Sequence, residues 1–224
     1  MARGRFVVIE GIDGAGTTTQ TSLLVSRLRK EGIVARGTRE PSTGPIGSLI
    51  RQVLTGRVAL PTAKGDTESH GSWGTMALLF AADRMDHVGW EIEPALRTGE
   101  FVVSDRYVAS SLAYQSLTAP PDVKHALEWV RTLNDMAIKP DLTIVLDVPA
   151  DVAATRREIR GEQEERYERL ELQKKLAKFY RDLPSVLPDQ RVELIDGSKD
   201  VSDVHGAIVQ LVRERYASLP PPPA

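Results

Sequence analysis

The sequence contains no cysteine, so a disulfide framework, a catalytic thiolate and a cysteine-based zinc or iron–sulfur site are all excluded. Neither sign of charge dominates, because 29 Lys and Arg stand against 31 Asp and Glu, and the net charge of −2 gives no field that favours nucleic acid. Long apolar runs are lacking too: Phe6 to Ile9 ends at Glu10, too short for a signal peptide or a membrane span. We therefore expect a cytoplasmic protein with no nucleic-acid and no membrane partner, in which any anion site is local.

Short apolar runs alternate with helix-length patterns along the chain. The run Phe6 to Ile9 is typical of a strand buried on both faces, and leucines at helical spacing follow it as far as Gly32. Further strands are predicted at 33–35, 101–103, 142–146 and 192–195, and further helices at 46–54, from 75 to before 99, through 127–133, from 149 and after 200. This alternation predicts an α/β fold, a three-layer α/β/α sandwich with a central parallel sheet.

The 224 residues, 41% hydrophobic and 27% charged, suffice for one large domain with a sizeable core. We assign residues 1–219 to a single domain. Two regions interrupt its rhythm, the glycine-containing segment 57–74 and the charged segment 155–169, and both are interpreted as insertions or mobile segments. The tail 220–224, PPPPA, cannot continue a helix.

The segment GIDGAGTT, Gly11 to Thr18, lies between the first predicted strand and helix, where phosphate-binding loops occur. Its glycines let backbone N–H groups converge on phosphate oxygens, and the helix start adds its own N–H groups and positive dipole end. Thr18 is positioned to bind magnesium through its hydroxyl. Thr17 replaces the lysine of the usual GxxxxGK[ST] pattern, so one positive charge is missing. A plain glycine-rich turn is the alternative at this point.

Four segments follow one another in the order and approximate spacing of a known family: EGIDGAGTTTQ, TREPSTGPIG, LLFAADRMDH and SDRYVASSLAYQ. With PDLTIVLDVP and the arginine-rich RREIRGEQEERYE, the chain resembles bacterial-type thymidylate kinases over nearly its whole length. The resemblance implies a P-loop nucleoside-monophosphate kinase fold, with ATP and magnesium as cofactors, dTMP as acceptor and a homodimer. The implied reaction transfers the γ-phosphoryl group of ATP to dTMP, giving dTDP and ADP in dTTP biosynthesis.

The resemblance also assigns the donor side of the site. Magnesium is expected on Thr18 and Asp105, and segment 155–169 corresponds to the family's lid. Since Ile12 to Gly14 contain no arginine, the resemblance is to the variant in which the lid carries it. ATP is expected on Gly11, Ile12, Asp13, Gly14, Ala15, Gly16, Thr17, Thr18 and Thr19. The expected catalytic residues are Asp105, Arg106, Arg156, Arg160 and Arg166, and candidates to replace the charge missing at Thr17 are Arg156, Arg157, Arg160 and, more remotely, Lys64.

On the acceptor side, Phe80 and Arg84 are four residues apart on a predicted helix, so both can meet one flat ligand. By resemblance, Phe80 stacks on thymine, Arg84 donates to its O4, and Arg106 grips the phosphate. The expected dTMP-binding residues are Asp13 near the sugar 3′-hydroxyl, Arg39, Phe80, Arg84, Arg106, Ser111 at the base, Tyr114 near the 2′ position and Gln115, with Arg51 a further phosphate candidate.

Two alternative functions stay open at this level. One is a nucleotide-binding protein of the same fold that lost transfer together with the loop lysine, and the other is a kinase for another nucleoside monophosphate. Taken singly, Phe80 fits a core position, Asp105 and Arg106 fit an ion pair that caps a helix, and the charged segment fits a solvated helix with i,i+4 pairs.

Overall fold

The computed structural model describes residues 3–60, 70–159, 161 and 166–216. Its contacts divide the chain into two compact units. The sheet unit comprises Met1–Thr38, Ala95–Arg106 and Lys139–Ala224, and the helical unit comprises Arg39–Pro94 and Tyr107–Ile138. The assignment of 1–219 to a single domain stays a prediction, and each unit is described by itself.

The sheet unit is built on a five-stranded parallel sheet with the strand order β2-β3-β1-β4-β5. Its central strand is buried from Phe6 onward, and Val7 lies opposite Val103 on one side and Leu142 on the other. This burial confirms the prediction of a strand covered on both faces. The strands are β1 (Arg5–Glu10), β2 (Ala35–Arg39), β3 (Phe101–Asp105), β4 (Leu142–Asp147) and β5 (Val192–Asp196).

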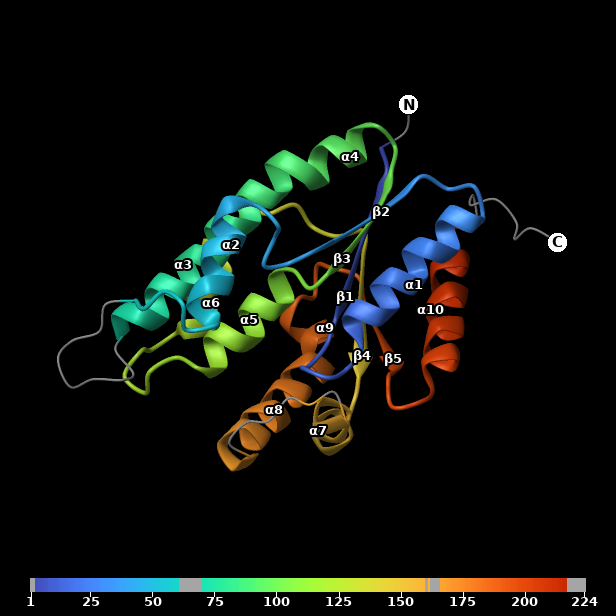
Figure 1. Ribbon diagram of the computed structural model, residues 1–224. Coiled ribbons are helices and arrows are strands. Elements are labelled where there is room, and N and C mark those ends of the chain that lie inside the picture. The colour runs from blue at the N-terminus through green and yellow to red at the C-terminus, as the bar shows by residue number, and fades with distance from the viewer. Residues whose placement is uncertain (1–2, 61–69, 160, 162–165, 217–224) are drawn as a thin grey trace. The chain divides into compact units, whose positions relative to one another are not determined.

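Helices cover both faces of this sheet, which confirms the three-layer α/β/α architecture (Figure 1). Helices α1 (Thr17–Lys30) and α10 (Val201–Arg215) pack side by side on one face. On the other face, α8 (Arg166–Arg181) contacts β4 and α9 (Leu183–Val186) contacts β5. Helix α7 (Ala150–Ile159) follows β4 and packs on α8, and α4 (Glu93–Arg97) precedes β3.

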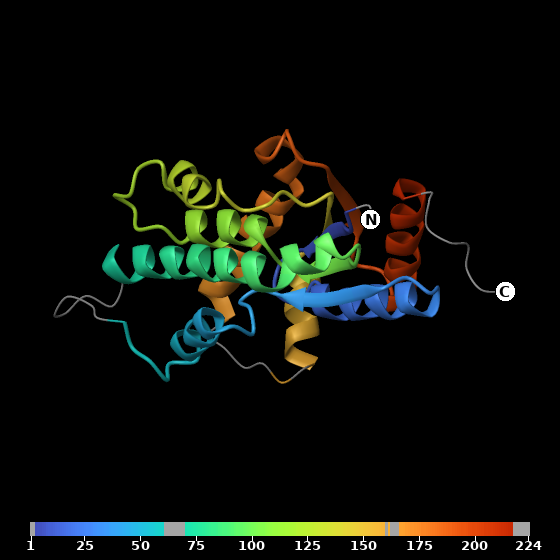
Figure 2. The ribbon, with the colours of Figure 1, turned by 90° about the horizontal axis from the view of Figure 1, so that it is seen from above.

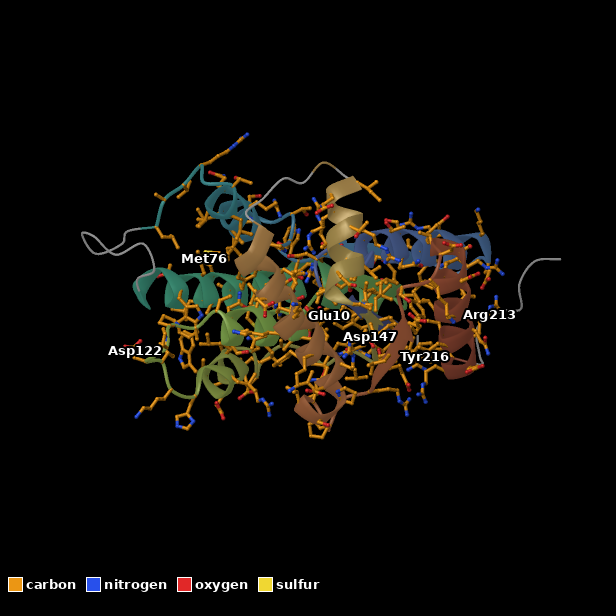
Figure 3. The ribbon with its side chains drawn as sticks, turned by 90° about the horizontal axis from the view of Figure 1, so that it is seen from below. Glu10, Met76, Asp122, Asp147, Arg213 and Tyr216 are labelled. Carbon is orange, nitrogen blue, oxygen red and sulfur yellow. The ribbon has the colours of Figure 1, made fainter. Side chains whose placement is uncertain are left out.

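Two contacts fix the end of α10, one from Arg213 in its last turn and one from Tyr216 directly after it, both marked in Figure 3. Arg213 forms a 2.5 Å ion pair with the nearly buried carboxylate of Glu31, which caps α1. The ring of Tyr216 packs edge-on against Phe101, with 5.6 Å between the ring centroids. The helix is therefore joined both to α1 and to the sheet.

The helical unit consists of α2 (Pro45–Leu54), α3 (His70–His87), the π-helical turn η1 (Val88–Ile92), α5 (Val108–Leu117) and α6 (Ala126–Leu133). Helix α3 is its central element and packs on α2, α5 and α6, as the view from above shows for α3 and α5 (Figure 2). No helix in the described ranges is long and apolar enough to cross a membrane.

Two predicted boundaries are wrong. The strand expected at 33–35 begins at Ala35, because β2 is an edge strand whose polar residues hide it from an apolar pattern. The helix expected from Thr75 begins at His70 and passes through the π-turn before it ends. The segments interpreted as insertions are partly helical, since 70–74 belong to α3 and 155–159 to α7. Residues 61–69, Arg160, 162–165 and the tail lie outside the described residues.

Candidate active site

The glycine loop connects β1 to α1 as the sequence predicts. Gly14 and Gly16 adopt positive φ angles of 92° and 97°, which favour glycine. A Cβ atom on Gly14 would lie only 2.5 Å from the carbonyl oxygen of Ala153, so the close approach of α7 requires glycine there. Helix α1 begins at Thr17 without a side-chain cap, which leaves its first backbone N–H groups available to an anion.

Thr18 and Asp105 meet beside this loop. The Thr18 hydroxyl donates to Asp105 Oδ2 at 2.5 Å, and the other carboxylate oxygen, Oδ1, is buried without a hydrogen-bond partner among the described residues. A hydroxyl and a carboxylate oxygen are ligands that Mg²⁺ accepts when substrate phosphates and water complete its shell. The pair therefore fits magnesium, although the described part of the chain holds no cluster of three or more His, Cys, Asp or Glu side chains that would bind a metal alone.

A second polar group is centred on Asp13 in the loop. Arg106 Nη2 donates to Asp13 Oδ1 at 2.8 Å, and Gln173 Nε2 donates to Oδ2 at 3.3 Å. Arg106 also lies 3.5 Å from the hydroxyl of Tyr180, which donates at 3.3 Å to the buried carboxylate of Glu10, marked in Figure 3. Arg106 has a φ of 70°, unusual for a residue with a side chain, and such strain concentrates at functional sites.

The arginines at the end of α7 point to different partners. Arg156 donates to the carbonyl oxygens of Gly197, Ser198 and Lys199, at 2.9 to 3.2 Å. Arg157 instead is buried and donates through Nη1 to the backbone carbonyl of Asp13 in the glycine loop. Arg160 and the side chain of Arg166 lie outside the described residues.

In the helical unit, the guanidinium of Arg84 is only 1% exposed and is surrounded by acceptors. Its Nε and Nη2 atoms donate to Glu40 Oε2 at 2.9 and 2.6 Å, and Nη1 donates to Asn134 Oδ1. Nη2 also lies 3.0 Å from the hydroxyl of Ser111 and 3.1 Å from the carbonyl oxygen of Tyr107. The structure thus brings together two residues expected at the base, Arg84 and Ser111.

The second oxygen of Glu40 binds another buried cation. His87 Nδ1 lies 3.2 Å from Glu40 Oε1, and Nε2 lies 3.5 Å from Glu91 Oε2. Burial lowers the pKa of His87, but the hydrogen bonds and charges of the two carboxylates outweigh it and raise this pKa to about 9. His87 is therefore a second cation of this cluster at neutral pH.

The remaining acceptor-side residues differ in burial. Phe80 and Tyr114 are half-buried, while Arg39 is exposed at the end of β2. Gln115 is buried, and among described residues its side-chain oxygen has no partner. Arg51 donates to the carbonyl oxygens at residues 41 and 42, so it braces that loop.

Sequence reasoning missed the residues that hold the predicted ones in place. Glu40 lies in the TREP segment and His87 follows Arg84 by one helical turn, so both carried a usable signal of spacing. Asn134, Gln173 and Tyr180 come from distant parts of the chain without a motif. Only the tertiary fold brings Asn134 to Arg84, Gln173 to Asp13 and Tyr180 to Arg106.

The glycine loop between β1 and α1, together with the hydroxyl–carboxylate pair at the end of β3, places the protein in the class of P-loop nucleotide-binding proteins. The family model described as thymidylate kinase matches residues 9–208, and the chain belongs to the thymidylate kinase family.

Similar proteins agree over nearly the full length of both chains. A probable thymidylate kinase of Thermococcus onnurineus is 42% identical over 208 residues, which are 92% of this chain and 96% of that protein. A probable thymidylate kinase of Pyrococcus horikoshii is 37% identical over 217 residues, which are 97% of this chain and all of that protein. A thymidylate kinase of Rhodopseudomonas palustris is 38% identical over 219 residues, 95% and 90% of the two chains.

Proposed function

We propose that this enzyme transfers the γ-phosphoryl group of ATP to dTMP and produces ADP and dTDP for dTTP synthesis. The observation that carries the proposal is the Thr18–Asp105 pair beside an uncapped helix start and a glycine loop, in a chain of the thymidylate kinase family. This is the arrangement that binds the phosphates of a nucleotide and its metal ion.

ATP would lie with its phosphates along residues 11–19, bound by the backbone N–H groups of the loop and of the first turn of α1. Thr18 and Asp105 would hold magnesium, and the buried, unpartnered Oδ1 of Asp105 supports this role. When bound, the ion supplies positive charge to the phosphate oxygens.

For the acceptor, we assign dTMP-binding roles within each unit. In the helical unit, Phe80 stacks on thymine and Arg84, with Ser111, recognises its polar edge. The rigid set of acceptors around Arg84 supports a fixed orientation of the guanidinium. In the sheet unit, Arg106 binds the phosphate and Asp13 the sugar 3′-hydroxyl. Further contacts are assigned to Arg39, Tyr114 and Gln115.

The reaction needs positioning and positive charge more than a base. An oxygen of the dTMP phosphate, already anionic near neutral pH, forms a bond to the γ-phosphorus, while the bond to the β–γ bridging oxygen breaks and ADP leaves. As in the bacterial type, we assign arginines of segment 155–169 to the transferring group: Arg156, Arg160 and Arg166. Arg156 donates to three carbonyl groups in the structure, so this role requires it to give up those bonds.

The test is ADP formation from ATP and magnesium with dTMP, dUMP or dGMP, combined with calorimetric binding of each nucleotide. We expect dTMP to be the best acceptor and dUMP weaker by about 1 kcal/mol, because one buried methyl group is lost. Equal turnover of dTMP and dGMP would contradict the assignment. Nucleotide binding without transfer to any monophosphate would favour the second candidate, a nucleotide-binding protein impaired at Thr17.

We also propose a homodimer that forms through one face of α3, since residues three or four apart on this helix are exposed and apolar. Leu78 is 51% and Met85 is 40% exposed, and the stripe also includes Ala82 on α3 and Gly89 in η1, both exposed. The variant Met85→Glu should shift the mass measured by light scattering from dimer to monomer, whereas Val34→Glu, at an exposed position of the sheet unit, should not. A wild-type monomer would exclude this proposal. The cytoplasmic location likewise stays a prediction.

A further inference from the structure

Arg157 is the residue from which we draw a further inference. Only 7% of it is exposed, and it comes from the last turns of α7, against the glycine loop. Nη1 donates to the carbonyl oxygen of Asp13, and a Cβ atom on Gly14 would lie 3.2 Å from Arg157 Cγ. The side chain is therefore held directly against the loop that would bind phosphates.

The charge of Arg157 has no counterion in the described part of the chain. No carboxylate there pairs with it, and the acceptor of its hydrogen bond is a neutral carbonyl group. The nearby carboxylate of Asp13 is engaged by Arg106 and Gln173. Burying a cation without an anion is costly, so this guanidinium is prepared for an anion that the described residues do not supply.

The loop lacks a cation at the position where one is usual. Thr17 is buried and neutral, whereas the common pattern has a lysine that reaches the β- and γ-phosphates. We propose that Arg157, reaching in from α7, replaces the missing lysine and binds the terminal phosphate oxygens of the nucleotide. This rests on the proposed function for the identity of the nucleotide, and it assigns a phosphate-binding role that Thr17 cannot fill.

Two other arginines that the structure describes near the loop have partners of their own. Arg156 donates to three carbonyl groups of the segment after β5, and Arg106 is paired with the carboxylate of Asp13. Arg157 combines burial, contact with the loop and an unneutralised charge. Its guanidinium has five N–H donors, so donors remain for phosphate oxygens after the bond to Asp13.

The first experiment compares binding of ADP and AMP by calorimetry, because only ADP carries the β-phosphate. Arg157→Gln should weaken ADP binding at least tenfold and leave AMP binding within twofold. Arg157→Lys, which keeps the charge, should retain most of the ADP affinity. The control Arg215→Gln removes an arginine that is paired with Glu193 on β5, and it should change neither affinity. ADP affinity that survives Arg157→Gln would overturn the inference.

Unfolding by urea separates this role from a structural one. Without nucleotide, Arg157→Gln should unfold at the same or a higher urea concentration than the wild type, because it removes an unneutralised buried charge. A lower midpoint, together with equal losses of ADP and AMP binding, would show that Arg157 only supports the loop and would overturn the inference.

The second experiment asks whether a positive charge at position 17 substitutes for the one at position 157. Thr17→Lys should restore at least tenfold of the ADP affinity in the Arg157→Gln background, but should add little to the wild type. If the double variant unfolds like the wild type but Thr17→Lys restores none of the ADP affinity lost in Arg157→Gln, the proposal that Arg157 replaces the lysine is overturned. None of these binding titrations contains dTMP, so their result does not depend on the proposed acceptor. If ADP binding behaves as expected and no monophosphate is phosphorylated, the proposed function fails and this inference stands.

Discussion

Among the described residues, Arg84 in the helical unit and Arg157 in the sheet unit are both almost fully buried, and their surroundings are opposite. Arg84 is bound by the carboxylate of Glu40, and by oxygens of Asn134 and Ser111. Arg157 donates to one backbone carbonyl group, and among the described residues no anion balances it. The charge of Arg84 is neutralised by Glu40, whereas the charge of Arg157 is available to an anionic ligand.

This difference matches the ligand that we propose for each region. A thymine base is neutral, so an arginine that meets it is best held in one orientation and balanced internally. Phosphates are anions, so a loop that binds them gains from a cation without a competing carboxylate. A carboxylate beside a buried arginine thus gives the side chain a fixed orientation and stabilises the fold, whereas an arginine without a carboxylate gains affinity for phosphate.

Removing the carboxylate that neutralises Arg84 should have the largest effect on stability. Glu40→Gln leaves the buried cations Arg84 and His87 without their shared carboxylate, and we expect a loss of about 3–5 kcal/mol in the free energy of unfolding, measured by urea denaturation. The matched control is Glu100→Gln, whose partner Arg36 is substantially exposed, and it should cost at most about 1 kcal/mol. Equal losses in the two variants would show that burial of the pair does not matter.

The next effect concerns the anionic side of the phosphate region. Asp105→Asn keeps the shape of the side chain and an acceptor for Thr18, but removes the charge expected to hold magnesium. We expect kcat to fall on the order of 10²–10³-fold, with a higher magnesium requirement and little change in stability. The control is Asp147→Asn at the end of β4 in the same sheet, where the carboxylate is paired with Arg181. A magnesium dependence unchanged from wild type would remove Asp105 from the metal site.

His87 should make the stability of the helical unit depend on pH. Its pKa is about 9 in the folded protein and 6.5 for an ordinary histidine in the unfolded chain, so between these values the folded state binds more protons than the unfolded state. The stabilisation is complete below pH 6.5 and is lost as pH rises toward 9, a change of about 2–3 kcal/mol. Urea unfolding at pH 6, 7.5 and 9 measures it. His87→Gln should reduce the dependence of the unfolding free energy on pH. An equally steep dependence in that variant would show that other groups cause it.

Much of the fold is predictable from sequence because it depends on local patterns. The strand, glycine loop and helix from Phe6 onward could be located from an apolar run, glycines and leucine spacing. The predicted position of the edge strand β2 is wrong because the position of this strand depends on pairing with β3 and not on its own hydrophobicity. The π-turn after His87 is equally invisible in the pattern.

The candidate site is predictable only where motifs carry it. Thr18 and Asp105 come from separate motifs, yet both follow strands of one parallel sheet, so their meeting at its carboxyl end could be expected. The choice of Arg157 over Arg156 had no such signal. Adjacent residues on a helix point in different directions, and only the packing of α7 on the loop distinguishes them.

The smallest effect concerns the base and depends on Phe80, which is half-buried on α3. Phe80→Ala should weaken dTMP binding by about 1–3 kcal/mol, because stacking of an aromatic ring on a base has this magnitude. ATP affinity should stay unchanged, since ATP is assigned to the sheet unit. Phe80→Leu keeps an apolar side chain without the aromatic face, so it should lose nearly as much if stacking is responsible and much less if only apolar contact matters. Calorimetry with dTMP and ATP measures both affinities, and urea unfolding detects any loss of stability. A variant that binds dTMP as the wild type does, or that loses both nucleotides equally, would remove Phe80 from the acceptor site.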